Sequence, residues 1–253
     1  MFADERRAKI ADMVRKNHSV SSSELTETFR VSLETIRRDL ESMEEQGLLK
    51  RVHGGAISVG KLQSYHDLSL RSEVHQPQKR RLCLAACSCM KNGDFIALDS
   101  GSTAYELAKL ICERSESLTV LTHSLEVFEI LSENANIRTI LAGGFYHPEE
   151  KCFYGHPALD MLRQFHVGKS FIAPSAISLG FGISDHLHEL IEIQRAIMGI
   201  SDEVYVLVDS SKFETCAPFQ ICGLNTGHTY LTDSDLPDDI YEAYQKTGIN
   251  IKK

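Results

Sequence analysis

From Lys79 onward, short apolar runs alternate with amphipathic stretches, and this alternation most strongly limits the folds open to the chain. A short apolar run is typical of a buried strand, whereas apolar residues at three- and four-residue spacing are typical of a helix. Alternating strands and helices predict an α/β domain, a doubly wound and largely parallel sheet with helices on both faces. The expected strands are 95–98, 118–121, 137–141, 170–173, 204–208 and 229–231, and the expected helices lie near 80–91, 103–114, 124–133, 157–165, 189–200 and 238–246.

The first sixty residues carry a different pattern, that of three short helices. Capping signals open the second and third helices: Ser21 with Glu24 three residues later, and then Ser32. Only the turn at 30–31 separates these two helices, an arrangement typical of a helix-turn-helix. The helices are expected over 5–16, 21–29 and 32–45, with inward residues Ile10, Met13, Val14, Leu25, Phe29, Ile36, Leu40 and Met43.

Strand-forming residues flank a glycine pair at positions 54 and 55. Residues 48–59 therefore predict a β-hairpin, or wing, after the third helix. Glycine has no side chain, so such a turn lets the backbone approach a phosphate closely. Periodicity alone leaves a plainer alternative open, in which the first part is a three-helix cap whose arginines are only solvated.

The net charge of −8 is unevenly distributed along the chain. Residues 1–58 contain ten basic and ten acidic residues, so the whole excess of acid lies in residues 59–253. Within the first part, positive charge gathers at Arg37, Arg38, Lys50 and Arg51. Because the local field governs phosphate binding, the acidity of the whole chain does not exclude a nucleic-acid partner.

The run VSLETIRRDLESMEEQGLLKRVHGGA, residues 31–56, closely resembles the DNA-binding signature of the DeoR family of bacterial regulators. Ser32, Thr35-Ile36-Arg37-Arg38-Asp39-Leu40 and Arg51-x-His53-Gly54-Gly55 occur in order and at family spacing, and the likeness covers about residues 6–58. The resemblance implies a winged helix-turn-helix that reads operator DNA.

The chemistry of this segment suits duplex DNA. The hydroxyls of Ser32 and Thr35 can bind phosphates, and the guanidinium of Arg37 or Arg38 can bind a guanine in the major groove. We expect these two arginines to divide the base and phosphate contacts, in either order, and we expect the wing to touch the DNA backbone. The candidate DNA-binding residues are Ser32, Glu34, Thr35, Arg37, Arg38, Arg51, His53, Gly54 and Gly55.

Small polar residues follow the expected strands of the second part, at the sheet edge where such folds bind ligands. The segment DSGST, residues 99–103, opens a helix and offers N–H groups, hydroxyls and a positive helix dipole to an anion. Each such segment alone is also compatible with helix capping or a solvated lysine, but four of them at four strand ends predict a phosphorylated ligand. The candidate residues are Asp99, Ser100, Gly101, Ser102, Thr103, Thr122, His123, Ser124, Gly143, Gly144 and Lys212.

The segments DSGST, LTHSL, LAGG and VDSSKF look like the effector domain of the same family, so the likeness extends over nearly the whole chain. Members of that family sense phosphorylated sugars or related metabolites, with a domain similar in fold to ribose-5-phosphate isomerase and sugar-phosphate deaminases. The resemblance implies that residues 99–103 cradle the phosphate, that Lys212 approaches the ligand and that Glu189 reaches its hydroxyl end.

Two places depart from the family pattern. Ala173, Pro174 and Ala176 stand where the family often has glycines, and Gln194-Arg195 stands where many members carry a Lys-Arg pair. Both places lie near the expected sugar end of the site. They leave the phosphate site intact and the identity of the sugar open.

Seven cysteines in a chain without an export signal argue against a disulfide framework. Cys83, Cys87 and Cys89 share one expected helix, but the third points away from the other two and no compact fourth ligand is near. We therefore expect core thiols rather than a metal site. We also expect no cofactor, since no GxGxxG follows the first strand of the second part and no GxxxxGK[ST] occurs.

The N-terminal residues are charged, and no window approaches the roughly 18 apolar residues of a membrane span, so we expect a cytoplasmic protein without a membrane partner. Residues 59–78 are polar, lack clear periodicity and contain Pro77, which is typical of a linker. The expected domains are a winged helix-turn-helix at 1–58, the linker at 59–78 and an effector-binding domain at 79–253.

Together these patterns favour a transcription regulator over an enzyme. We expect a repressor of a carbohydrate-metabolism operon that binds double-stranded operator DNA and is controlled by a phosphorylated sugar. Paired half-sites need a paired reader, so we expect a homo-oligomer, a dimer or a tetramer. The alternative is a sugar-phosphate isomerase or deaminase with a fused DNA-binding domain, whose candidate bases are Asp99, His188 and Glu189.

Overall fold

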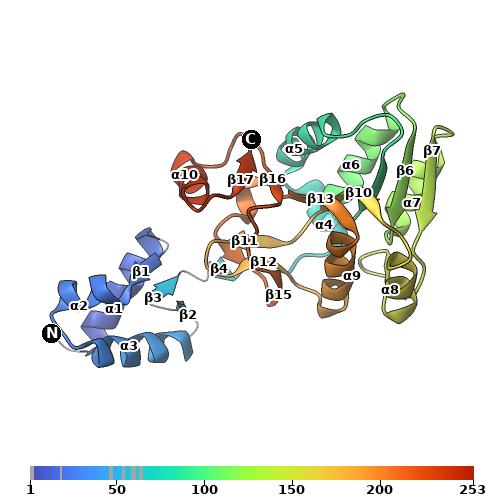
Figure 1. Ribbon diagram of the computed structural model, residues 1–253. Coiled ribbons are helices and arrows are strands. Elements are labelled where there is room, and N and C mark those ends of the chain that lie inside the picture. Colours follow the sequence, from blue (N-terminus) through green and yellow to red (C-terminus); the bar gives the residue numbers. More distant parts are fainter. Residues whose placement is uncertain (1–2, 18, 46–47, 53–54, 58–60, 63–64) are drawn as a thin grey trace.

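The computed structural model describes all residues except 1–2, 18, 46–47, 53–54, 58–60 and 63–64. It has a smaller N-terminal part and a larger α/β part, joined by one connecting segment (Figure 1). This arrangement confirms the expected fold class.

The N-terminal part is a winged helix-turn-helix. Its elements are α1 (Ala3–Asn17), β1 (Ser19–Ser21), α2 (Ser22–Phe29), α3 (Leu33–Glu45), β2 (Lys50–Val52) and β3 (Gly55–Ile57). The three strands pair antiparallel in the order β1-β3-β2. The inward residues expected from the helical spacing meet in one core, in which Ile10, Leu25, Ile36 and Met43 are fully buried.

A seven-stranded sheet, parallel throughout, forms the centre of the larger part, with the order β17-β16-β13-β10-β5-β6-β7. All six strands expected from the sequence belong to it, and the edge strand β17 is an addition. The strands are β5 (Phe95–Leu98), β6 (Leu118–Thr122), β7 (Ile137–Leu141), β10 (Val167–Ile172), β13 (Ser201–Leu207), β16 (Thr229–Leu231) and β17 (Asn250–Lys252).

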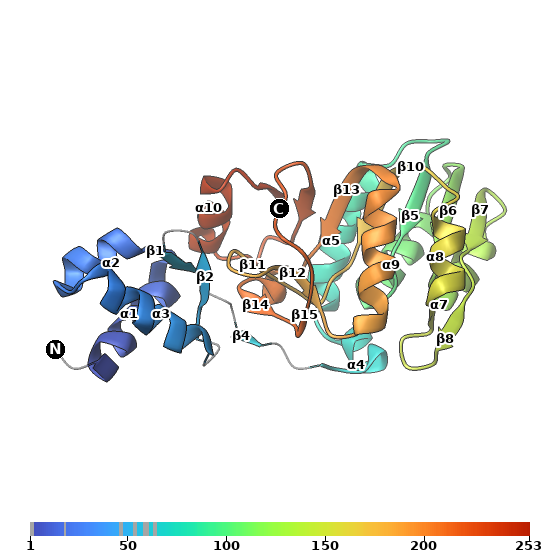
Figure 2. The same cartoon turned by 60° about the horizontal axis from the view of Figure 1, so that its bottom comes forward.

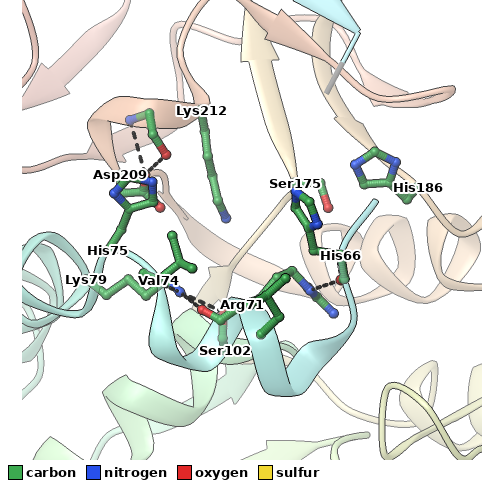
Figure 3. A pocket seen from close by; sticks show the side chains of 12 residues that line it. His66, Arg71, Val74, His75, Lys79, Ser102, Ser175, His186, Asp209 and Lys212 are labelled. Carbon is green, nitrogen blue, oxygen red and sulfur yellow. Dashed lines mark hydrogen bonds between the residues drawn. The ribbon is translucent and has the colours of Figure 1, made fainter. Parts of the chain in front are cut away.

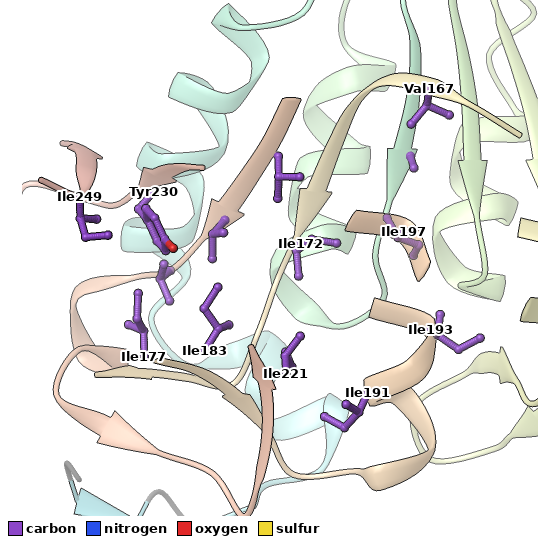
Figure 4. Packing of buried hydrophobic residues seen from close by; sticks show 14 of the residues in the cluster. Val167, Ile172, Ile177, Ile183, Ile191, Ile193, Ile197, Ile221, Tyr230 and Ile249 are labelled. Atoms are coloured by element: carbon purple, nitrogen blue, oxygen red, sulfur yellow. The ribbon is translucent and has the colours of Figure 1, made fainter. Parts of the chain in front are cut away.

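Helices cover both faces of this sheet, because its strands are apolar on both sides. Alternate strand residues belong to two separate cores: Phe171 packs with α5, α6 and α7, whereas its neighbour Ile172 packs with α8, α9 and α10 (Figure 4). The helices are α5 (Gln76–Ser88), α6 (Ser102–Cys112), α7 (Leu125–Ser132), α8 (His156–Leu162), α9 (His188–Gly199) and α10 (Asp238–Lys246).

The strand order reverses direction between β5 and β10. After β5 the chain adds β6 and β7 on one side, and it then returns to add β10, β13, β16 and β17 on the other. The helices that follow β5 and β10 therefore leave the sheet on opposite faces and open a crevice at the carboxyl ends of these two strands. The fold thus places its natural ligand position after Leu98 and Ile172.

Short strands outside the main sheet were not expected from the sequence. A hairpin of β8 (Phe145–His147) and β9 (Cys152–Tyr154) follows β7, and β11 (Ala176–Ser178), β12 (Gly182–Asp185) and β15 (Phe219–Cys222) form a small antiparallel sheet. Runs of three or four residues are too short to show a clear period in a sequence, which explains why they were missed.

The range expected to be a plain linker contains regular structure. Strand β4 (Lys61–Leu62) pairs in parallel with β14 (Thr215–Cys216), helix α4 (Leu68–Glu73) follows, and α5 already begins at Gln76 (Figure 2). The sequence predicted that this helix would begin near residue 80, after a linker that contains Pro77. Proline fits the first turn of a helix, where its missing N–H costs nothing.

No helix in the described part of the chain is long and apolar enough to cross a membrane. Of the seven cysteines, Cys83, Cys87 and Cys152 are buried, the other four are half-buried, and none forms a disulfide. Burial raises the pKa of Cys83 and Cys87, which pack in the core beside α6. These thiols are core residues, as expected.

Candidate functional site

The structure builds the expected recognition helix from its capping signals. Arg30 ends α2 in the left-handed conformation at φ 50°, which turns the chain sharply toward α3. The Thr35 N–H donates to Ser32 Oγ at 3.2 Å, and the hydroxyls of the two residues are 2.9 Å apart. Ser32 therefore caps α3, and its hydroxyl lies at the positive end of that helix.

The outer face of α3 presents the expected DNA-binding side chains. Ser32, Glu34, Arg37 and Arg38 are exposed, and Thr35 is half-buried. The two arginines differ in their surroundings. Arg38 Nε lies 3.3 Å from Glu34 Oε1, one turn away, whereas Arg37 forms no ion pair with any residue that the structure describes. Among the described residues, therefore, Arg37 is the arginine of this pair whose guanidinium has no ion-pair partner.

Asp39 belongs to the recognition helix but faces inward. Its side chain is 2% exposed and accepts hydrogen bonds from Arg6 Nε and from Arg7 Nε, the latter at 2.9 Å. This charge cluster ties α1 to α3. The sequence contained a signal for it, because position 39 lies on the same helical stripe as the buried Ile36 and Met43.

The wing is joined to the recognition helix by charge. Arg51 pairs with Glu41 of α3 at 3.3 Å, and the Arg51 N–H donates to Glu44 at 2.8 Å. A Cβ on Gly55 would lie 2.1 Å from the carbonyl oxygen of Val20, so the glycine is required where β3 pairs with β1. The expected DNA contacts His53 and Gly54 lie outside the described residues.

A cavity of about 480 Å³ lies at the carboxyl ends of β5, β10 and β13, at the reversal point of the sheet (Figure 3). Its volume is that of a small-molecule site. One wall comes from the connecting segment: His66, Leu70, Arg71, Val74, His75 and Lys79. The other comes from residues that follow the strands of the two sheets: Ser102, Ser175, His186, Asp209, Ser211 and Lys212.

Three cationic side chains converge on this cavity. Lys212 extends toward the side on which Lys79, Ser102 and Arg71 lie (Figure 3). Lys79 Nζ donates to Ser102 Oγ at 3.0 Å, to Val74 O at 2.9 Å and to Arg71 O, and Lys212 Nζ donates to Pro174 O at 2.7 Å. Arg71 pairs with the buried carboxylate of Glu150, in the turn between β8 and β9.

The cations of the cavity are electrostatically unfavourable for one another. Burial, then the nearby charges of Lys212 and Arg71, lower the pKa of Lys79 to about 8, although Asp209 opposes the change. Burial also lowers the pKa of Lys212, with Arg71 adding to the effect and Asp209 opposing it. Depressed lysine pKa values mark a site where an anion would be stabilised.

Helix α6 points its N-terminus at the same place. Its first residue follows Gly101, which adopts φ 91° and provides no side-chain cap. A Cβ at Gly101 would lie 3.6 Å from Arg71 NH1, so the guanidinium lies against this turn. The hydroxyl of Thr103 is buried and has no hydrogen-bond partner in the described structure. The first turn of α6 therefore offers free N–H donors beside two of the cations.

The opposite end of the cavity is lined by the polar side chains of Ser175 and His186, with the Asp185 carboxylate beside them. Ser175 Oγ donates to Asp185 Oδ1 at 2.7 Å, and the His186 side chain lies nearby (Figure 3). Burial lowers the pKa of His186, which keeps the imidazole neutral and able to donate and accept hydrogen bonds. This end suits hydroxyl groups rather than a second anion.

A buried polar network lies behind that wall. Gln194 Nε2 donates to Asp185 Oδ2 at 2.9 Å and to Asp99 Oδ2 at 3.2 Å, and His123 Nε2 lies 3.1 Å from Asp99 Oδ1. Burial disfavours a charge on His123, but its hydrogen bonds to Asp99 and Cys152 outweigh burial and raise its pKa to about 10. Asp99 and His123 thus form a buried hydrogen-bonded pair that supports the site from behind.

The structure separates the expected effector residues into two groups. Ser102 and Lys212 line the cavity, and Gly101 lies against Arg71. Asp99 accepts bonds from two backbone N–H groups and two side chains, Ser124 caps α7, and Glu189 is exposed on α9. The expected residues that do not line the cavity are Asp99, Ser100, Gly101, Thr103, Thr122, His123, Ser124, Gly143, Gly144 and Glu189.

Sequence reasoning missed the whole wall that the connecting segment contributes. Its lining residues lie on α4, on α5 and on the segments before and between these helices, with no shared period, so no motif marks them. One signal was present: Lys79, Arg80 and Arg81 lie near the start of α5, where positive charge opposes the helix dipole. Cations at such a position need a compensating anion, supplied for Arg81 by Asp235.

Comparison with known proteins gives each of the two parts of the chain a family match. Residues 6–61 match the DeoR-like helix-turn-helix domain, and residues 74–234 match the DeoR C terminal sensor domain. The chain is 32% identical to the uncharacterized HTH-type transcriptional regulator YulB of Bacillus subtilis, over 99% of this chain and 96% of that protein. It is 31% identical to the L-fucose operon activator of Haemophilus influenzae, over 95% and 96%.

Further similarities are more distant. The chain is 28% identical to a putative aga operon transcriptional repressor of Escherichia coli O157:H7, over 98% of this chain and 92% of that protein. Among solved structures, ribose 5-phosphate isomerase A from Methanocaldococcus jannaschii aligns with a TM-score of 0.40 and 18% identity, over 53% of each chain. From the two domain matches and the full-length relatives, the chain belongs to the DeoR family of helix-turn-helix transcriptional regulators.

Proposed function

We propose that this regulator represses a carbohydrate-metabolism operon and that a phosphorylated sugar, bound in the cavity of the sensor domain, controls its hold on DNA. The observation that carries the proposal is the convergence of Arg71, Lys79 and Lys212 on the uncapped N-terminus of α6. A buried lysine whose pKa is lowered by burial and by nearby cations is stabilised in its charged form by an anion, and a phosphoryl group supplies two negative charges.

The proposed orientation follows from the two ends of the cavity. The phosphoryl group would lie between Lys79, Lys212 and the first turn of α6. The hydroxyl groups of the sugar would lie toward Ser175 and His186, which offer neutral donors and acceptors. In this proposal Ser175 and His186, rather than Glu189, contact the hydroxyl groups of the sugar, because the Glu189 side chain is exposed outside the cavity.

Two relatives are named for carbohydrate or operon control, one as an L-fucose operon activator and one as an aga operon repressor. They support a role in regulating a sugar operon. Repression is the sign that we propose here. A homo-oligomer, a dimer or a tetramer, is part of the proposal, since symmetric half-sites require two copies of the recognition helix.

On the DNA side we propose that Arg37 reads a base and that Arg38, held by Glu34, contacts a phosphate. Arg37 has no ion pair among the described residues, so it can present both its donors to a guanine without losing a partner. Ser32, Thr35 and Arg51 would position the helix through the backbone of the operator.

An isomerase or deaminase is the competing function, and the geometry disfavours it. A catalytic base must come within hydrogen-bond reach of the substrate. Asp99 is buried behind the wall, and His188 and Glu189 are exposed on α9, so none of the three candidate bases lines the cavity. We therefore propose a sensor that binds its ligand without converting it.

A panel of phosphosugars, tested by thermal shift, examines the proposal directly. A ligand at 100 times its dissociation constant should add about 2.7 kcal/mol to the free energy of unfolding. The stabilising compound should then alter binding to operator DNA in a mobility-shift assay. Turnover of ribose 5-phosphate or glucosamine 6-phosphate would favour the enzyme, and a protein that no phosphosugar stabilises would contradict the proposal.

A further inference from the structure

We propose that residues 65–79 form a latch that senses the occupant of the cavity and passes the signal to the DNA-binding domain. The latch consists of the Arg71–Glu150 ion pair and the hydrogen bonds from Lys79 to the carbonyls of Arg71 and Val74. The proposal rests on the proposed function, since it takes the occupant to be an anion.

The first part of the latch, residues 65–73, lies between the two family domain matches. The helix-turn-helix match ends at residue 61 and the sensor match begins at residue 74, so α4 (Leu68–Glu73) lies between them. Even so, three residues of this interval, His66, Leu70 and Arg71, line the cavity. A segment between two domains that also forms a wall of the ligand site is placed to couple them.

Lys79 links the occupancy of the cavity to the position of α4. A lysine ammonium has three donors, and in the structure two hold the carbonyls of Arg71 and Val74 at the end of α4, while the third holds Ser102 Oγ. An anion that reaches Lys79 must take the place of at least one of these bonds. When the anion displaces one of the bonds to Arg71 or Val74, helix α4 therefore loses a hydrogen bond that holds its C-terminal end in place.

Arg71 gives the second link. Its Nε donates to the carbonyl of His66 at 2.9 Å, and its Nη2 donates to both carboxylate oxygens of Glu150. The Glu150 side chain is 3% exposed and also accepts a hydrogen bond from the Tyr65 hydroxyl at 2.9 Å. The same guanidinium lies against the turn at Gly101, where the anion would bind. An anion there competes with Glu150 for Arg71.

The backbone at both ends of α4 is suited to transmit a movement. His75 joins α4 to α5 in the left-handed conformation at φ 56°, ψ 32°, which is unfavourable for a residue other than glycine. Upstream, β4 (Lys61–Leu62) pairs with β14, which begins three residues after Lys212. The chain that leads to the wing is thus attached to the cavity through α4 and through the segment that carries Lys212.

Hydrogen exchange of the full-length protein tests the latch, with inorganic phosphate as the probe. Glu150→Gln removes the charge that holds Arg71 and keeps the shape, and Glu149→Gln makes the same change at an exposed neighbour. We expect Glu150→Gln to raise amide exchange in residues 68–75 by at least about tenfold without phosphate, and Glu149→Gln to leave it within about twofold. Saturating phosphate should loosen the same amides in the unmodified protein while raising its melting temperature.

Each outcome separates the latch from the site that it senses. If Glu150→Gln exchanges no faster than Glu149→Gln, the latch does not hold α4 and the inference is wrong. If phosphate stabilises the protein but leaves exchange in 68–75 unchanged, the coupling is wrong and the proposed function stands. If phosphate does not stabilise the protein, the anion site fails and the coupling with it. Tyr65→Phe, which removes only one bond to Glu150, gives a milder loosening should Glu150→Gln not fold.

Discussion

The two anion-binding regions of this protein use cations in opposite ways. On α3 the arginines are exposed and close to water, and the Arg38 side chain is 76% exposed. In the sensor domain Lys79 is only 5% exposed, Arg71 and Lys212 are half-buried, and these groups already make hydrogen bonds within the protein. The first region is an exposed surface that can bind a polyanion. The second is a cavity in which keeping the cations charged costs free energy until an anion binds.

The difference teaches how each region can respond to its partner. Exposed charges attract DNA over a distance, are screened by salt and can be lost without harm to the fold. Buried charges act only on a ligand that enters the cavity, and they rearrange internal bonds when it does. The first arrangement suits binding, and the second suits switching.

The largest expected effect is on stability, and it compares the loss of a buried charge in the DNA-binding domain with the loss of an exposed one. Asp39→Ala leaves Arg6 of α1 buried without this counter-charge, so we expect a loss of about 3–5 kcal/mol in the stability of this domain. Urea unfolding followed by circular dichroism measures it. Glu34→Ala, which breaks only the exposed pair with Arg38, is the matched control and should cost less than about 1 kcal/mol. Equal losses for the two variants would contradict the comparison.

The next effect concerns the cavity. Lys212→Met removes a charge-assisted hydrogen bond to the anion, and we expect phosphate binding to weaken by about 1.5–3 kcal/mol. Titration calorimetry with inorganic phosphate measures the change. Lys151→Met, at an exposed lysine paired with Glu126, should leave the affinity unaltered. Unchanged phosphate affinity in Lys212→Met would remove this lysine from the site.

The third prediction concerns the exposed arginines of α3 and their effect on DNA binding. Arg37→Ala should cost about 1–3 kcal/mol of discrimination between the operator and a single-base variant, because a base contact is lost. Arg38→Ala should weaken both DNA sequences about equally and flatten the dependence on salt. Mobility shifts at two salt concentrations distinguish the two. The reverse assignment would follow if Arg38→Ala alone lost discrimination.

The smallest effect is a pH dependence that only the buried cations predict. An anion favours protonated Lys79, whose pKa is lowered to about 8 in the free protein by burial and by Lys212 and Arg71. The affinity for phosphate should therefore be at its maximum below about pH 7.5 and should fall as the pH rises through 8. The decrease in affinity should approach tenfold per pH unit. The probe for this measurement is a phosphate monoester, which keeps its two negative charges over this range because its second pKa is near 6. Calorimetry from pH 7 to 9.5 measures the change, and Lys79→Met should weaken the dependence.

Much of this could be predicted from particular residues. The six strands, the position of the cavity after β5 and β10, and the cavity residues Ser102 and Lys212 followed from apolar periodicity and from the polar residues at strand ends. Asp99 was expected to bind the phosphate for the same reason. It instead turns inward to His123, because the first residue after β5 still belongs to the core.

The sequence by itself determined the three N-terminal helices and the main strands and helices of the α/β part, since helix caps, strand runs and the recognition helix depend on neighbours a few residues apart. It also determined the family, because the DNA-reading signature is contiguous in the chain. Only the tertiary structure decided what faces the cavity. Arg71 meets Glu150 and Lys79 meets Ser102 across 79 and 23 residues of chain, and no local pattern records contacts of that range. Long-range packing, rather than local preference, therefore turned a polar stretch between two domains into a wall of the ligand site.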